Sequence, residues 1–142
     1  MNEEERWHLL VVLDDELLTG GVILSEWCSF ITREADTAFA KGAYLASILA
    51  SVSAIETHLR SENMQTGRKR LVELIDSAGL KPELAQDLHK LRRYRNKWVH
   101  VEAPWDDEAL VEDPGRYEKE LEEMAFVAVK ALRQTIYFYQ WV

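Results

Sequence analysis

The sequence predicts an all-α protein that folds as a single antiparallel bundle of about five to six helices. Three observations support this prediction. Only three prolines and six glycines interrupt the 142 residues. Apolar residues recur at three- and four-residue spacings, and no stretch alternates polar and apolar side chains as a half-buried strand does. Because the length is that of one domain, we expect residues 1–21 to form an N-terminal extension helix and residues 22–142 to form the bundle.

The composition is typical of a soluble globular protein, with 47% hydrophobic and 30% charged residues. The single cysteine, Cys28, excludes an internal disulfide and favours a reducing, cytoplasmic setting. We expect no secretory signal peptide, because the chain opens with three glutamates and lacks a basic n-region. The longest uncharged apolar stretch, residues 42–55, is too short to span a bilayer. We therefore expect no membrane association, and the sequence indicates neither a metal ion nor a cofactor.

Helical periodicity assigns most of the chain to helices. The expected helices cover residues 3–18, 22–39, 43–61, a fourth segment opening at Thr66-Gly67, a fifth beginning near Pro82, and 117–141. In the second helix we expect the apolar stripe to be Ile23, Trp27, Phe30, Ile31 and Ala38. The third helix carries small residues on one flank, which favours close approach of a neighbouring helix. An acidic connection over residues 101–115 is long for a compact domain, which indicates a functional or mobile loop.

The fifth helix contains a charge where its own pattern predicts core. Leu84, Leu88 and Leu91 continue at the same spacing to position 95, which is Arg95, and then to Trp98. A guanidinium cannot lose its charge by titration, so it needs a carboxylate, water or a bound anion. Glu56, at the edge of the apolar stripe of the third helix, is one candidate partner. A ligand phosphate is the other.

Two further residues of this helix can serve chemistry. His100 follows Arg95 by five residues, about 140° around the helix and about 7.5 Å along it. Asn96 precedes His100 by one turn and can orient the imidazole or bond a phosphate oxygen. An imidazole exchanges protons near neutral pH, and an arginine stabilises a pentavalent phosphate. Arg95, Asn96 and His100 therefore form a candidate catalytic set for RNA cleavage, with Glu56 in a supporting role.

Charge is segregated along the chain. The formal net charge is −8, yet residues 68–100 hold nine Lys or Arg against four Asp or Glu, a net of +5. We expect Arg92, Arg93 and Lys97, with Arg68 to Arg70, to bind the RNA backbone. Tyr94, Trp98 and Trp105 offer rings for base stacking, although Trp98 is more typical of a core or interface residue. We expect His8, His58 and His89 to be ordinary surface residues.

The motif also carries a family resemblance. Arg95, Asn96 and His100 match the Arg-x4–6-His signature, with a polar residue after the arginine, and in this the chain resembles HEPN domains, a superfamily of helical bundles. Residues 44–60 are similar to the central helix of that family, and the resemblance covers roughly residues 22–142. It implies a homodimer whose two motifs meet in one composite cleft and cleave RNA without a metal ion. Such proteins often act as toxins or in antiviral defence, so the resemblance also implies a cognate antitoxin, often nucleotidyltransferase-like, as a possible partner.

Other interpretations remain open at this stage. Some HEPN-like domains are non-catalytic modules that bind proteins or nucleotides, and the overall acidity of the chain is compatible with that role. In such a module Arg95 and Glu56 would form a structural ion pair. Dimerisation is itself an expectation, which rests on Trp98, Trp105 and the aromatic run at the end of the chain.

Overall fold

Helices account for nearly all of the regular structure, as the sequence predicts. The structure, a computed structural model, describes residues 1–63 and 69–141. The helices in these residues are α1 (Glu3–Leu17), α2 (Glu26–Ala40), α3 (Tyr44–Glu62), α4 (Leu71–Ser77), α5 (Pro82–Val99), α6 (Glu108–Glu112) and α7 (Pro114–Ile136). Within the described ranges the only β-type pairing is one isolated bridge, between Gly21 and Trp141. The prediction of an all-α bundle is confirmed.

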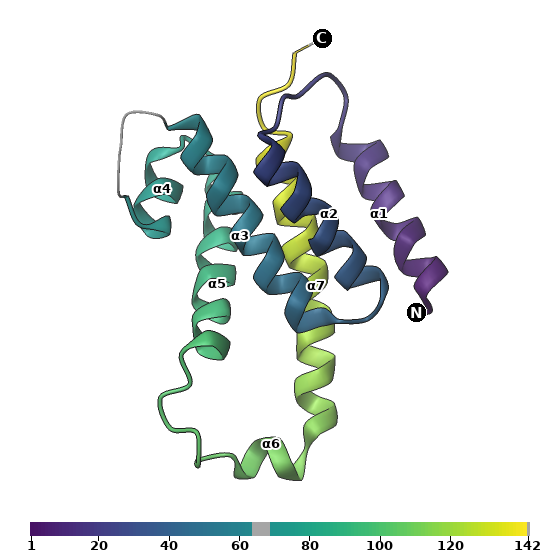
Figure 1. Cartoon of the computed structure of the whole chain (residues 1–142), viewed down its shortest axis with the longest axis vertical. Coiled ribbons are helices and arrows are strands. Elements are labelled where there is room, and N and C mark those ends of the chain that lie inside the picture. The colour runs from purple at the N-terminus through teal and green to yellow at the C-terminus, as the bar shows by residue number, and fades with distance from the viewer. Residues whose placement is uncertain (64–68, 142) are drawn as a thin grey trace.

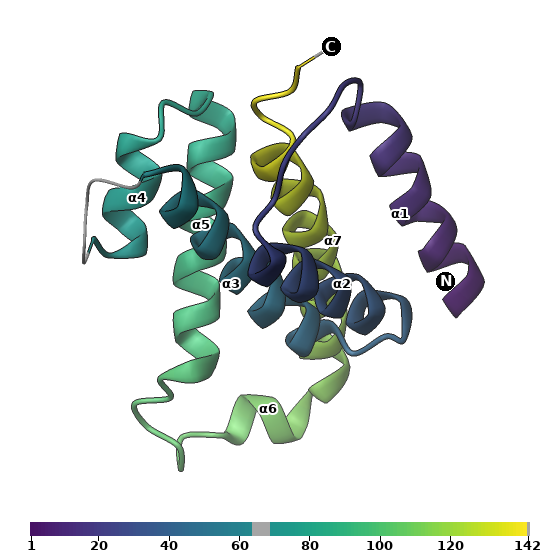
Figure 2. The ribbon, with the colours of Figure 1, turned by 45° about the horizontal axis from the view of Figure 1, so that its top comes forward.

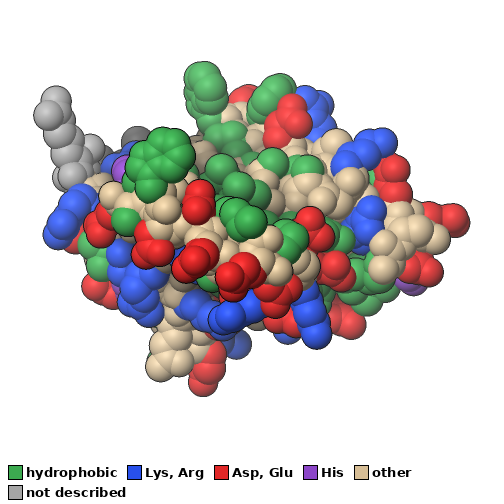
Figure 3. Space-filling model, turned by 90° about the horizontal axis from the view of Figure 1, so that it is seen from below, with side chains coloured by type: hydrophobic (Ala, Val, Ile, Leu, Met, Phe, Trp, Pro, Cys, Tyr) green, Lys and Arg blue, Asp and Glu red, His purple; other side chains and the backbone are tan. Residues whose placement is uncertain are grey.

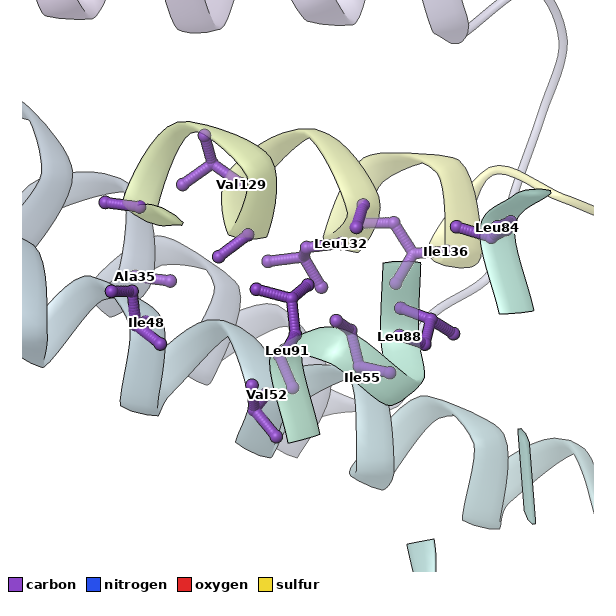
Figure 4. Packing of buried hydrophobic residues seen from close by; sticks show 14 of the residues in the cluster. Ala35, Ile48, Val52, Ile55, Leu84, Leu88, Leu91, Val129, Leu132 and Ile136 are labelled. Atoms are coloured by element: carbon purple, nitrogen blue, oxygen red, sulfur yellow. The ribbon is translucent and has the colours of Figure 1, made fainter. Parts of the chain in front are cut away.

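The bundle is built around α3 and α7. α2 and α7 pack most extensively against α3, while α1 lies on one side of this centre and α4 with α5 on the other (Figure 1). The core cluster includes Val52 and Ile55 of α3, which lie near Leu91 and Leu88 of α5 beneath α7, and Ile48, which lies beside Ala35 of α2 (Figure 4). α5 and α7 separate toward one end of the molecule, where α6 spans the gap between them (Figure 2).

The small flank of α3 allows α2 to approach closely. Ser47 and Ala54 are fully buried, and the Ser47 hydroxyl donates a hydrogen bond of 2.9 Å to the carbonyl of Ala35 on α2. The Cys28 thiol donates to the carbonyl of Ala54 at 3.7 Å. These side chains fill the α2–α3 interface without holding the backbones apart.

The predicted apolar stripe of α2 is wrong for Ile23, Trp27 and Phe30, which are exposed, whereas Ile31 packs against the core. The buried face consists of Cys28, Ala35 and Phe39, each fully buried, whereas Trp27 and Phe30 are 77% and 55% exposed. Apolar side chains occur on two sides of this helix. Cys28 and Ala35 are small enough to fit against the serine- and alanine-rich flank of α3, and Phe39 packs near Tyr44 at the start of α3, whereas Trp27 and Phe30 face outward.

Several predicted boundaries also change. α4 begins at Leu71. The expected start at Thr66-Gly67 falls on residues that the structure does not describe. The 101–115 connection contains the short helix α6, and α7 starts at Pro114, where the Asp113 side chain caps it by accepting from the backbone N–H of Arg116 at 3.2 Å. α7 ends at Ile136, and Trp141 instead pairs with Gly21.

Two glycines let the chain segment after α1 lie against the C-terminal segment. Gly21 and Trp141 exchange two backbone hydrogen bonds of 2.6 and 3.0 Å. A Cβ on Gly20 would collide with the backbone oxygen of Trp141, and a Cβ on Gly21 would lie 2.9 Å from the Trp141 ring. Since real Cβ atoms do not approach this closely, only glycine fits at these positions without displacing Trp141.

Candidate functional site at the end of α5

The motif residues occupy the last two turns of α5. Pro82 starts the helix at a first-turn position that suits proline, and Leu84, Leu88 and Leu91 are buried as predicted. The helix ends at His100, whose backbone N–H donates to the Asn96 carbonyl at 2.9 Å. Arg95 is half-buried, one turn beyond the last leucine of the buried stripe. Arg95 therefore lies where this face of the helix passes from the core to the surface.

Arg95 is held by its neighbour and by no carboxylate. Its Nε donates a hydrogen bond of 3.1 Å to the side-chain oxygen of Asn96. The predicted ion pair between Arg95 and Glu56 is not formed. Glu56 instead lies 3.8 Å from Arg60, one turn further along α3. Among the described residues no acidic side chain lies within ion-pair distance of Arg95. Within residues 1–63 and 69–141, no hydrogen bond is formed by its two terminal nitrogens.

His100 is exposed and faces a different surface from Arg95. It lines a cavity of about 430 Å³ together with Trp98, Tyr117 and the connection that leads to α6. Arg95 and Asn96 do not line this cavity. Three carboxylates from the connection do: Glu102, Asp106 and Asp107. Figure 3, which views the molecule from the α6 end, shows acidic, basic and hydrophobic side chains interspersed on this face.

Three aromatic rings fix the end of α5 against α7. Trp98 lies edge-on to Tyr94 and to Tyr117, with ring centroids 6.4 Å apart in both pairs. Burial, with the nearby Glu120 carboxylate adding to it, raises the pKa of Tyr94 to about 12. The Lys97 ammonium lies 5.6–6.0 Å from the three ring centres and 3.7 Å from Glu120. Lys97 and Trp98, expected at an RNA surface, thus contribute to packing, while Trp105 is 93% exposed.

The other predicted basic residues are less neutralised. Arg92 is half-buried and its Nε has no hydrogen-bond partner within the described chain. Arg93 is exposed, and neither arginine forms an ion pair with any residue of the described ranges. Arg70 pairs with Glu73 at 2.9 Å, and Arg68 lies outside the described residues. Arg92, Arg93 and Arg95 of α5 therefore have no ion-pair partner among the described residues.

The structure contains a buried arginine that sequence reasoning missed. Arg133 of α7 is 2% exposed, and its guanidinium donates to Asp14 of α1 and to both carboxylate oxygens of Asp36 on α2. The Tyr137 hydroxyl also donates to Asp14, at 2.8 Å. A signal existed, because position 133 extends the four-residue spacing of the buried Ala125 and Val129.

Two histidines also differ from expectation. His58 is 6% exposed, in a cavity wall between α3, α4 and the end of α7, and burial lowers its pKa. His89 lies 2.8 Å from an Asp76 carboxylate oxygen, linking α5 to α4. The prediction that both are ordinary surface residues is wrong. Tertiary pairs such as His89–Asp76 leave no trace in the periodicity of a single helix.

Neither a metal centre nor a membrane segment emerges from the described residues. No three His, Cys, Asp or Glu side chains among them are grouped so as to hold a metal ion, and none of the helices they form combines the length and apolarity of a membrane span. Comparison with protein-family models, with curated proteins and with solved structures found no match to this chain.

Proposed function

We propose that this protein is an endoribonuclease of HEPN type that uses no metal ion and acts as a toxin or defence effector. Its site would be assembled from Arg95, Asn96 and His100 of two copies. The observation that carries the proposal is the state of Arg95, a half-buried guanidinium without a carboxylate partner. Arg133, which is fully buried, has two such partners.

The contrast between the two arginines has a physical meaning. A buried ion without a counter-charge costs several kcal/mol, roughly 3–5 when a partner is removed. The fold meets this requirement at Arg133 with two aspartates, in a protein that has 25 acidic residues to draw on. It does not do so at Arg95. A phosphate is well matched to a guanidinium whose orientation is already fixed by Asn96.

The chemistry requires one proton acceptor, one proton donor and a stabiliser of negative charge. His100 would remove the proton from a ribose 2′-hydroxyl, and the 2′-oxygen would then attack the adjacent phosphorus. As the bond from phosphorus to the 5′-oxygen breaks, that oxygen takes a proton from solvent water, and the His100 imidazolium returns its proton to solvent afterwards. Arg95 would stabilise the charge on the pentavalent phosphate. The products are a 2′,3′-cyclic phosphate and a free 5′-hydroxyl.

Two copies are needed because one copy directs these groups apart. Arg95 and His100 are separated by about 140° around α5, and Arg95 does not line the cavity that His100 faces. A second α5 end placed against the first would bring His100 of one copy to Arg95 of the other. The aromatic cluster Tyr94–Trp98–Tyr117 holds the helix end rigid enough to form such a contact.

The charges near the motif would also set the direction from which RNA approaches His100. Glu102, Asp106 and Asp107 line the His100 cavity, and they repel phosphate. Arg92 and Arg93 lie earlier on α5 and do not line that cavity. RNA would therefore follow α5 and reach His100 from the arginine side, with the exposed ring of Trp105 as a stacking surface at the edge.

The test is cleavage of single-stranded RNA in EDTA by the wild type, Arg95→Ala and His100→Ala. We expect cleavage by the wild type alone, with cyclic-phosphate ends. His8→Ala, which changes another exposed histidine, and Arg60→Ala serve as matched controls and should cleave normally. Equal cleavage by all five proteins would reject the assignment. RNA binding without cleavage would instead support the non-catalytic alternative.

A further inference from the structure

The outer face of α2 is apolar and uncovered. Trp27 and Phe30 of α2 are 77% and 55% exposed and three residues apart, and Ile23, in the segment just before the helix, is 76% exposed. In Figure 1 α2 lies in front of α7, with no helix over its near side. Contiguous apolar patches of this kind on soluble proteins mark interaction surfaces. No contact links α2 to α5, so this surface is separate from the Arg95 motif.

The charges beside these residues form a self-complementary pattern. Phe30 lies in the middle of the exposed arc of α2, and Glu26 and Arg33 lie on one flank of it, at most about 60° away. They are seven residues apart, nearly two turns. Neither has an ion-pair partner among the residues that the structure describes, and the Arg33 guanidinium rests over the Phe30 ring, 4.8 Å from its centre.

We propose that a second copy of this chain docks on the outer face of α2, with the two α2 helices antiparallel about a two-fold axis beside Phe30. Such an axis places residues of the same flank opposite one another at equal distances from the centre. Arg33 of each copy then meets Glu26 of the other, and the pairing occurs twice. Trp27 of each copy lies on the opposite flank, beside Glu34 and Ile31 of the other.

The size and composition of the surface fit an interface centre. A standard interface buries about 800 Å² on each partner, and aromatic residues and arginine are enriched at its core. Each exposed aromatic side chain can contribute on the order of 150–250 Å², so Trp27 and Phe30 provide the centre and their charged neighbours the rim. A helix whose two opposite charges sit symmetrically about its apolar centre fits a copy of itself better than a uniformly apolar or uniformly charged partner.

This association does not depend on the proposed ribonuclease site. It uses α2, whereas the composite site would use the end of α5. If both exist, each copy has two different contacts and the assembly is larger than a dimer. Loss of RNA cleavage in Arg95→Ala or His100→Ala should leave the α2 association unchanged, which separates a failure of one proposal from a failure of the other.

The sharpest test is a charge exchange. Glu26→Arg places two arginines opposite each other at both contacts, and Arg33→Glu places two glutamates there. We expect each single variant to associate at least tenfold more weakly than the wild type. An equimolar mixture of the two should associate preferentially as mixed pairs, because arginine then faces glutamate at both contacts. The double variant Glu26→Arg/Arg33→Glu should recover wild-type association.

Native mass spectrometry resolves the mixed pairs, and sedimentation velocity gives the assembly mass. Trp27→Glu should halve the mass of the wild-type assembly, whereas Trp105→Glu, which changes an even more exposed tryptophan, should not alter the α2 association. Circular dichroism verifies that each variant is folded. Wild-type mass retained in Trp27→Glu, or random mixing of the two single-charge variants, would overturn the proposal.

Discussion

The guanidinium of Arg133 donates two hydrogen bonds to the carboxylate of Asp36, from Nη1 at 2.9 Å and from Nη2 at 2.7 Å. This bidentate pair lies inside the bundle and joins α7 to α2. Asp14 completes the network from α1 by accepting from Arg133 Nε at 2.9 Å. Burial raises the pKa of Asp36 against the opposing attraction of Arg133, so the pair depends on the arginine staying in place.

Arg133 and Arg95 should respond differently to removal. Arg133→Ala leaves Asp14 and Asp36 without their counter-charge, and we expect it to lower the free energy of unfolding by roughly 3–5 kcal/mol. Arg95→Ala leaves no carboxylate unpaired and should cost less than about 1 kcal/mol. Urea unfolding monitored by circular dichroism measures both. A large loss for Arg95→Ala would indicate a structural role that its contacts do not show.

Stability should depend on pH through His58. Burial lowers its pKa below the ordinary 6.5, so the folded protein binds fewer protons than the unfolded chain just below that pH. The stabilising contribution is fully present above about pH 6.5 and is lost as the pH falls through the lowered folded value. We expect this part of the pH dependence to disappear in His58→Gln and to persist in the control His8→Gln, as measured by chemical unfolding at several pH values.

The contact between Gly20 and Trp141 permits no side chain. Gly20→Ala forces a Cβ against the Trp141 backbone, and we expect a loss of about 1–3 kcal/mol in the free energy of unfolding. Gly115→Ala is the matched control, since its Cβ would meet nothing closer than 3.9 Å. Thermal unfolding of the two variants should separate them. Equal melting temperatures would show that the C-terminal segment adds little to stability.

Subunit mixing tests whether the ribonuclease site is shared. Arg95→Ala and His100→Ala should each be inactive alone. If Arg95 of one copy acts with His100 of the other, half of the pairs in an equimolar mixture are mixed and each holds one intact site, so activity should return to roughly a quarter of the wild-type value. Activity that never returns on mixing would place the whole site within one copy.

Local periodicity predicted the parts of this structure that depend on one helix at a time. Leu84, Leu88 and Leu91 are buried where their spacing places them, and position 95 marks the point at which the same stripe leaves the core. The α2 stripe failed because hydrophobicity alone does not distinguish a side chain buried in its own bundle from one left for a partner. Trp27 and Phe30 are more apolar than Cys28 and Ala35, yet they point outward.

The features that were missed join residues far apart in the sequence. Arg133 and Asp14 are 119 positions apart. The Gly21–Trp141 pairing joins residues near the two ends of the chain. Neither pairing alters the pattern within its own segment. The separation of Arg95 and His100 around the helix follows from their spacing, whereas the cavity that His100 lines with the connection to α6 could not be predicted from the helix alone.

The position of Cys28 makes the kinetics of helix opening measurable in the unmodified protein. It is the only cysteine in the chain, it is fully buried between α2 and α3, and burial raises the pKa of its thiol. Since the thiolate is the reactive form, a thiol reagent reacts only when α2 lifts away from α3. The labelling rate therefore reports how often that helix opens. A second copy seated on the outer face of α2 would slow this labelling as the protein concentration rises.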